Sequence, residues 1–172
     1  MKKSIASLLA VVALAAVFGG CNYEAPIVPA TSAKPVDEAL LGVWHAVPAD
    51  SAKQSAPQVA LIQKFCDKMY LIQYPVQTED SLYFRGYRVE IDGKSYLQIQ
   101  LVGTDKGPVK ETDRKYDLAC YAVSGDMLEM RLLNTQVVPK LGTTDALMKV
   151  FLEKKADPAL FGEVLRFRRP PR

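Results

Sequence analysis

The chain has little of the material from which catalytic and metal sites are built. Among its 172 residues there is one histidine, His45, and there are three cysteines. A lone histidine without a second His or Cys at ligand spacing does not make a metal site. The sequence also lacks a Gly-x-Ser-x-Gly nucleophile motif and a glycine-rich phosphate loop. We therefore expect no catalytic residue, no metal and no cofactor, and a protein that is not an enzyme.

A strong excess of one charge is also missing. The chain has 22 Lys and Arg against 19 Asp and Glu, a formal net charge of +3. Domains that bind nucleic acid usually present a strongly basic face. The charge balance therefore predicts no nucleic-acid partner.

The longest apolar run lies at the N-terminus. Lys2 and Lys3 precede an alanine-rich run at residues 4–18, which is shorter than the about 20 strongly apolar residues of a membrane span. The run ends in Gly19-Gly20-Cys21. This ending resembles a lipobox, the site at which bacterial lipoproteins are acylated on cysteine and cleaved before it. The alternative is an ordinary signal peptide followed by a chance cysteine.

The resemblance to a lipobox implies a division of the chain. Residues 1–20 would be a signal peptide that is removed, and Cys21 would carry acyl chains such as palmitate as a membrane anchor. Asn22 follows the cysteine, which resembles lipoproteins of the outer membrane and implies a lipid-anchored envelope protein facing the periplasm. Residues 21–38 are rich in proline and small residues, so we expect the lipidated cysteine and an extended tether there, with a reach of roughly 50 Å.

Two cysteines remain once Cys21 carries lipid. Cys66 and Cys120 would lie in an oxidising compartment, where thiols often pair. They are therefore candidates for a disulfide. The alternative is that both are free cysteines that pack as small apolar residues.

Residues 39–172 are predicted to form one domain that is mainly β. Runs in which apolar residues recur at period two predict eight strands, at residues 41–47, 59–65, 69–76, 82–91, 97–101, 116–122, 127–134 and 163–168. Within residues 82–91 the apolar face changes across Gly86, which predicts a bulge or bend. Gln98 and Gln100 occupy the polar face of their strand, which is expected to be half-buried.

The period changes before the last strand. Thr143 to Asp145 can cap a helix that places Leu147, Val150 and Phe151 on one face. Eight strands joined mostly by short turns can close into an antiparallel up-and-down barrel. We therefore predict such a barrel, with one C-terminal α-helix before its last strand and lying across one mouth.

The first strand resembles that of a known family. Gly42-Val43-Trp44 matches the Gly-x-Trp signature of lipocalins, whose tryptophan closes the barrel floor. Over residues 39–169 the chain is similar to bacterial lipoproteins that carry a lipocalin-like β-barrel domain. Lipocalins also have an arginine packed on the tryptophan, for which Arg166 and Arg168 are candidates. Their Thr-Asp-Tyr motif is missing here.

Two functions follow from this sequence. The lipocalin resemblance implies a membrane-anchored barrel that binds a small apolar or amphipathic ligand, with candidate cavity residues Tyr70, Tyr74, Tyr87 and Tyr116. The alternative interpretation of these tyrosines, and the one that we favour, is ordinary barrel packing and decoration of the outer strand faces. The alternative is a non-enzymatic accessory lipoprotein that binds an envelope protein through its outer face. That alternative predicts a filled barrel and an exposed apolar patch.

Overall fold

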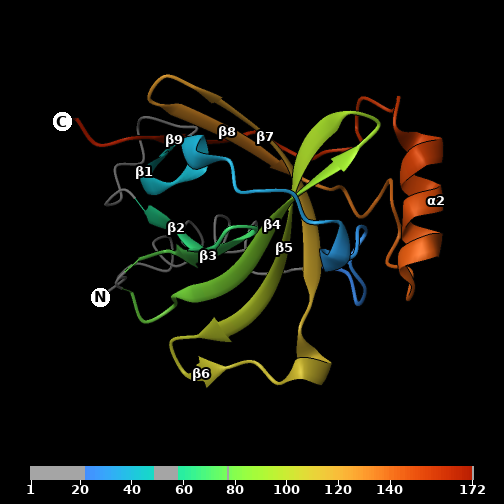
Figure 1. Cartoon of the computed structure of the whole chain (residues 1–172), viewed down its shortest axis with the longest axis horizontal. Helices are drawn as coiled ribbons and strands as arrows, with labels where there is room; N and C mark the ends of the chain where they lie inside the picture. The colour runs from blue at the N-terminus through green and yellow to red at the C-terminus, as the bar shows by residue number, and fades with distance from the viewer. Residues whose placement is uncertain (1–21, 49–57, 77, 172) are drawn as a thin grey trace, which may run out of the picture.

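The computed structural model describes residues 22–48, 58–76 and 78–171, which form a β-barrel with one α-helix beside it (Figure 1). The predictions that concern the signal peptide and Cys21 lie outside these residues.

The described residues form a closed barrel of eight antiparallel strands. These strands are β1 (Gly42–Val47), β2 (Val59–Cys66), β3 (Met69–Tyr74), β4 (Leu82–Ile91), β5 (Lys94–Thr104), β7 (Tyr116–Ser124), β8 (Met127–Leu132) and β9 (Leu165–Arg168). Each strand pairs with the next one along the chain, and β9 pairs with β1, which closes the ring. The short β6 (Gly107–Pro108) only pairs with the end of β5. The predicted lipocalin-like up-and-down barrel is therefore confirmed.

The inward-facing residues of the strands fill the barrel. They follow the period-two pattern of the sequence, because successive side chains of a strand point to opposite faces. This inner cluster includes Trp44, Ile62, Tyr70, Ile72, Tyr74, Phe84, Leu97, Ile99, Leu128, Met130 and Phe167. We call the end at which β1 begins and β9 ends the floor of the barrel.

The helix begins where the sequence predicts, but it does not cover a mouth of the barrel. It is α2 (Thr144–Lys154), and the hydroxyl of Thr143 caps it by accepting a hydrogen bond from the amide of Ala146 at 3.3 Å. Its buried residues Leu147 and Phe151 belong to a second cluster outside the barrel, so the predicted position was wrong. The reason is that β4, β5 and β7 also carry apolar residues on their outer faces, among them Tyr87, Val89, Tyr96 and Leu118.

Strand β4 is buried on both faces, which explains the pattern that the sequence presents at Gly86. Phe84 faces the inner cluster, whereas Tyr87 and Val89 face the outer one. Period-two alternation therefore continues through Gly86, and the register shift lies instead between Tyr83 and Phe84. A side chain at position 86 would meet Ile72 at 3.0 Å, so close packing accounts for the glycine.

Residues 22–40, which we call the N-terminal segment, are packed against the barrel and differ from the extended tether that the sequence predicts. Tyr23, Ile27 and Val28 are 0%, 0% and 5% exposed and belong to the outer cluster. The segment contains two short 3-10 helices, η1 (Ala30–Ser32) and η2 (Glu38–Leu40). Burial of these three apolar side chains offsets the preference of the Pro-rich composition for an extended, solvated chain.

Candidate functional site

The centre of the barrel holds only a small void. Its volume is about 20 Å³, which is about enough for one water molecule. Ligand pockets usually measure roughly 300–1,000 Å³. The void is lined by apolar side chains of six strands: Ala60, Ile62, Ile72, Tyr74, Phe84, Leu97, Ile99, Leu128, Met130 and Phe167. Side chains therefore fill the barrel.

The floor of the barrel is closed around the predicted tryptophan. Trp44 is fully buried, and its indole N–H donates to the carbonyl of Leu40 in η2 at 2.9 Å. Arg169 lies over the Trp44 ring at 4.4 Å from its centroid and donates to the carbonyl of Ala39 at 2.7 Å. Gly42 has φ +124°, and a side chain there would lie 3.2 Å from the Arg169 guanidinium. The Gly-x-Trp motif thus lies at the floor of the barrel.

The arginine on the tryptophan is Arg169, and the sequence candidates Arg166 and Arg168 were wrong. Both are outward-facing residues of β9 that make exposed ion pairs, Arg166 with Glu129 and Arg168 with Asp126. Arg169 follows the last residue of β9, so strand alternation does not assign it a side.

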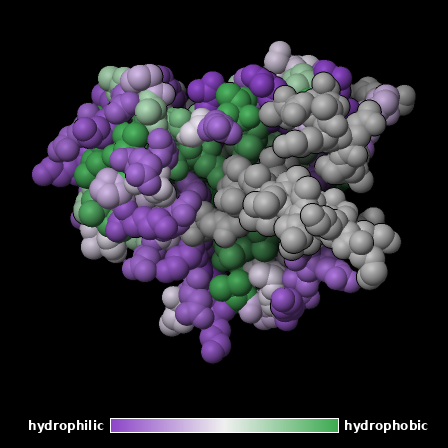
Figure 2. Space-filling model, turned by 180° about the vertical axis from the view of Figure 1, so that it is seen from behind, coloured by the Kyte–Doolittle hydropathy of each residue, from purple (hydrophilic) through white to green (hydrophobic). Residues whose placement is uncertain are grey.

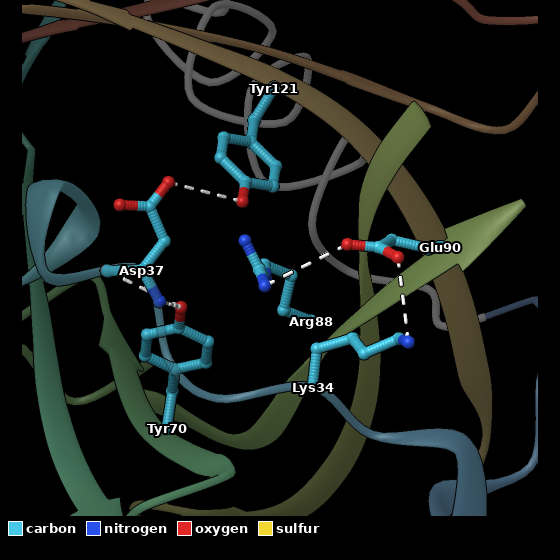
Figure 3. A network of polar contacts seen from close by, with 6 residues as sticks. All are labelled: Lys34, Asp37, Tyr70, Arg88, Glu90 and Tyr121. Carbon is cyan, nitrogen blue, oxygen red and sulfur yellow. Dashed lines mark hydrogen bonds and ion pairs between the residues drawn. The ribbon is translucent and has the colours of Figure 1, made fainter. Parts of the chain in front are cut away.

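A polar network fastens the N-terminal segment above the floor (Figure 3). The backbone amide of Asp37 donates to the Tyr70 hydroxyl, and the Tyr121 hydroxyl donates to the Asp37 carboxylate at 3.3 Å. Burial raises the pKa of Tyr70 and Tyr121, and the carboxylate of Asp37 raises both further. Both tyrosines are therefore neutral hydrogen-bonding groups at ordinary pH.

The same network includes charged residues of β4. Glu90 lies 3.5 Å from the ammonium of Lys34 and 3.8 Å from the guanidinium of Arg88. The amide of Lys34 also donates to the carbonyl of Arg88 at 2.8 Å. The two cations, Lys34 and Arg88, balance the charge of the carboxylates of Glu90 and Asp37. We therefore interpret the network as a set of contacts that holds the N-terminal segment against the barrel.

A buried glutamine holds the middle of the N-terminal segment. The side-chain oxygen of Gln98 accepts hydrogen bonds from the amides of Ile27 and Val28, at 2.9 and 3.2 Å. Its amide group donates to the carbonyl of Asp117 at 2.7 Å. Gln98 is 0% exposed and Gln100 is 6% exposed. The prediction of a half-buried strand was therefore wrong, because the segment covers the polar face of β5.

The start of the segment is fixed to the start of β7. Tyr23 and Tyr116 exchange two backbone hydrogen bonds of 3.0 and 2.8 Å, and the Tyr23 hydroxyl donates to the carbonyl of Val138 at 2.9 Å. The side-chain amide of Asn22 donates to the carboxylate of Asp117 at 3.3 Å. Asn22, the residue next to Cys21, is thus already in contact with the barrel.

Asp117 is a carboxyl group in an unusual environment. It is 1% exposed, and burial raises its pKa from 3.8 to about 7. Hydrogen bonds from the Leu118 amide, at 2.8 Å, and from Asn22 oppose this effect. Sequence reasoning missed both Gln98 and Asp117, because each looks like the polar half of an ordinary alternating strand.

No family model, curated protein or solved structure matches this chain.

The four tyrosines predicted to line a cavity do not converge. Tyr74 lines the small void and Tyr70 lies near the floor, both within the inner cluster. Tyr87 and Tyr116 belong to the outer cluster, under or beside the N-terminal segment. Burial raises the pKa of Tyr74 and Tyr87 to about 12. These tyrosines are packing residues in two separate clusters.

The two described cysteines are free thiols, and the fold keeps them apart. Cys66 ends β2 and Cys120 lies in β7. Three strands separate β2 from β7 in either direction around the ring, so the two strands are on opposite sides of the barrel. A disulfide requires Cα atoms within about 7 Å. The disulfide alternative is therefore not compatible with this fold.

The described surface carries a few exposed hydrophobic residues. In the view from behind, green hydrophobic surface lies between larger purple hydrophilic areas (Figure 2). The exposed large hydrophobics are Val43, Val47, Phe65 and Leu152, with Phe65 at 69%. Residues 22–48, 58–76 and 78–171 contain no helix long and apolar enough to cross a bilayer. In the same ranges, no three or more His, Cys, Asp or Glu residues gather where they could hold a metal ion.

Proposed function

We propose that this chain is a lipid-anchored protein of the bacterial envelope that is not an enzyme and binds an envelope protein through the outer face of its barrel. The filled barrel carries this proposal, because a void of about 20 Å³ leaves no room for a ligand of ordinary size. The anchor is supported by the resemblance of residues 1–21 to a lipobox signal, and the outer membrane by Asn22.

The binding face is proposed to lie on β1 and β2. Phe65 is 69% exposed near the end of β2, and Val43 on β1 is 39% exposed. Val43 pairs with Leu61 on the same outer face. Exposed aromatic and aliphatic side chains on one outer face are typical anchors of protein–protein interfaces.

A second candidate function is binding of a small apolar molecule inside the barrel. The observation that favours it is a closed barrel whose void has only apolar side chains around it. Such binding requires that inner side chains such as Phe84 and Met130 move aside to enlarge the void.

Site-specific crosslinking in living cells tests the first function. A photo-reactive residue at Phe65 or Val43 is expected to give an adduct of defined mass, whereas one at Ala122, exposed on β7, is expected to give none. Absence of adducts at Phe65 and Val43, or the same adducts at Ala122, would overturn the proposed binding face. Mass spectrometry of the chain extracted from membranes tests the anchor, and a mature chain without acylated Cys21 would contradict it.

Native mass spectrometry of a version lacking residues 1–21 separates the two functions. A bare protein mass is expected for a filled barrel. A small apolar molecule that copurifies and is displaced on unfolding would favour the second function.

A further inference from the structure

The attachment of the N-terminal segment determines how much freedom a lipid on Cys21 leaves to the barrel. Asn22 is bound to Asp117, and Tyr23 is fully buried with two backbone hydrogen bonds to Tyr116. One residue spans at most about 3.6 Å. A lipid on Cys21 is therefore one residue away from a fixed point of the barrel, with no slack chain between them.

The attachment continues over the whole segment. After Tyr23, the segment binds Gln98 on β5 through Ile27 and Val28, and then Arg88 on β4 through Lys34. A pull on residue 21 therefore acts on a chain held at β7, β5 and β4 in succession.

The fixed point lies across the barrel from the proposed binding face. Strand β7 begins at Tyr116, at the end of the barrel away from the floor, whereas β2 ends at the floor with Cys66. The two strands are also on opposite sides of the ring, with three strands between them in either direction. Phe65 is thus separated from Asn22 both along the barrel axis and across it.

We propose that a lipid on Cys21 mounts the barrel on the bilayer in one orientation, with the start of β7 against the lipid surface and Phe65 directed away from it. This proposal rests on the lipid anchor of the proposed function. The anchor then also orients the protein, because the barrel rests on the bilayer surface with β1 and β2 facing the compartment.

Depth-dependent fluorescence quenching tests the orientation. An azide-bearing residue replaces Thr112, which is exposed in η3 (Glu111–Asp113) just before β7, or Phe65, and is coupled to a fluorophore in the full mature protein. The protein is reconstituted in phosphatidylethanolamine–phosphatidylglycerol vesicles that contain a headgroup quencher. The label at position 112 is expected to be quenched several-fold more strongly than the label at position 65. Equal quenching at both positions would overturn the proposal.

A linker variant is the matched control. An asparagine followed by about ten Gly and Ser residues, with a span of roughly 17 Å, is inserted between Cys21 and Asn22. This leaves the residue after the cysteine and every described contact unchanged. The difference between the two labels is expected to shrink strongly, and a difference that persists would show that features other than the short attachment orient the barrel.

Chemical attachment separates failure of the orientation from failure of the anchor. In a chain that starts at residue 21, with Cys66 and Cys120 changed to Ala, the Cys21 thiol is coupled to a maleimide lipid. The same contrast between positions 112 and 65 is expected, whether or not cells acylate Cys21. Acylation in cells without this contrast would overturn the orientation alone, and a contrast without acylation in cells would overturn the anchor alone.

Discussion

The guanidinium of Arg169 lies over the Trp44 ring, 4.4 Å from its centroid, while it donates to the carbonyl of Ala39 at 2.7 Å. One side chain therefore joins the end of β9, the start of β1 and the 3-10 helix η2. These are the elements that close the floor.

Arg169→Ala is expected to destabilise the protein by about 1–2 kcal/mol, since it removes a cation–π contact and a hydrogen bond to a carbonyl. Arg169→Lys is expected to recover only part of this loss, because an ammonium cannot stack as a guanidinium does. Urea unfolding measures both. Arg168→Ala is the matched control, because it removes an exposed ion pair and an exposed hydrogen bond to the Met127 sulfur, and it is expected to change stability much less. Equal effects at the two positions would contradict the role of Arg169 at the floor.

Much of this floor was predictable, because Gly42-Val43-Trp44 is a local motif at the start of an alternating strand. The strands and the helix cap at Thr143 were predictable for the same reason, since period-two alternation and N-caps depend on near neighbours. Arg169 was not, because it lies beyond the last alternating residue of β9. Its place depends on η2, about 130 residues earlier in the chain.

The contacts of the N-terminal segment were not predictable either. Gln98 binds the amides of Ile27 and Val28, which are 71 and 70 residues away in sequence. Few apolar residues stand among the prolines of the segment, so its composition alone favours an extended tether. The same segment and α2 cover the outer face of β4, and β4 is therefore apolar on both faces. In the sequence alone this pattern resembles a bend at Gly86.

Asp117 is expected to make the stability depend on pH. Burial raises its pKa in the folded protein to about 7 from 3.8, so the folded state holds the proton more tightly than the unfolded state. Its stabilising contribution is fully present below about pH 4, is lost as the pH rises towards 7 and stays lost above it. The difference corresponds to at most about 4 kcal/mol.

Asp117→Asn is expected to remove this part of the pH dependence. The asparagine can still accept from the Leu118 amide, and Asn22 can turn its own amide to present an oxygen. Urea unfolding between pH 4 and 8 is compared for the wild type, Asp117→Asn and the exposed control Asp126→Asn. The wild type and Asp126→Asn are expected to lose stability relative to Asp117→Asn across this range. Parallel curves for all three proteins would show that Asp117 does not titrate there.

The thiols of Cys66 and Cys120 are expected to react at very different rates. Cys66 is exposed, whereas Cys120 is half-buried and burial raises the pKa of its thiol. Because the thiolate is the reactive form, Cys66 reacts first. Alkylation of a version lacking residues 1–21, without reductant, is expected to modify Cys66 quickly and Cys120 slowly or only after unfolding. Cys66→Ser is the control that removes the fast phase. Two thiols that react only after reduction would indicate a disulfide and contradict the fold.

Gln98 provides the most direct test of the docked N-terminal segment. Gln98→Ala leaves the amides of Ile27 and Val28 and the carbonyl of Asp117 without their side-chain partner, at a cost of about 1–3 kcal/mol for each group that stays buried. The segment is therefore expected to detach more often while the barrel stays folded.

Hydrogen exchange at Ile27 and Val28 reads out this detachment. Both amides are expected to exchange slowly in the wild type and much faster in Gln98→Ala, whereas amides of β1 and β2 change little. Gln100→Ala is the matched control, since Gln100 is also buried on β5 but accepts its hydrogen bond from Arg85, whereas the amides of Ile27 and Val28 bond to Gln98. Fast exchange at Ile27 and Val28 in the wild type would mean that the segment is not held.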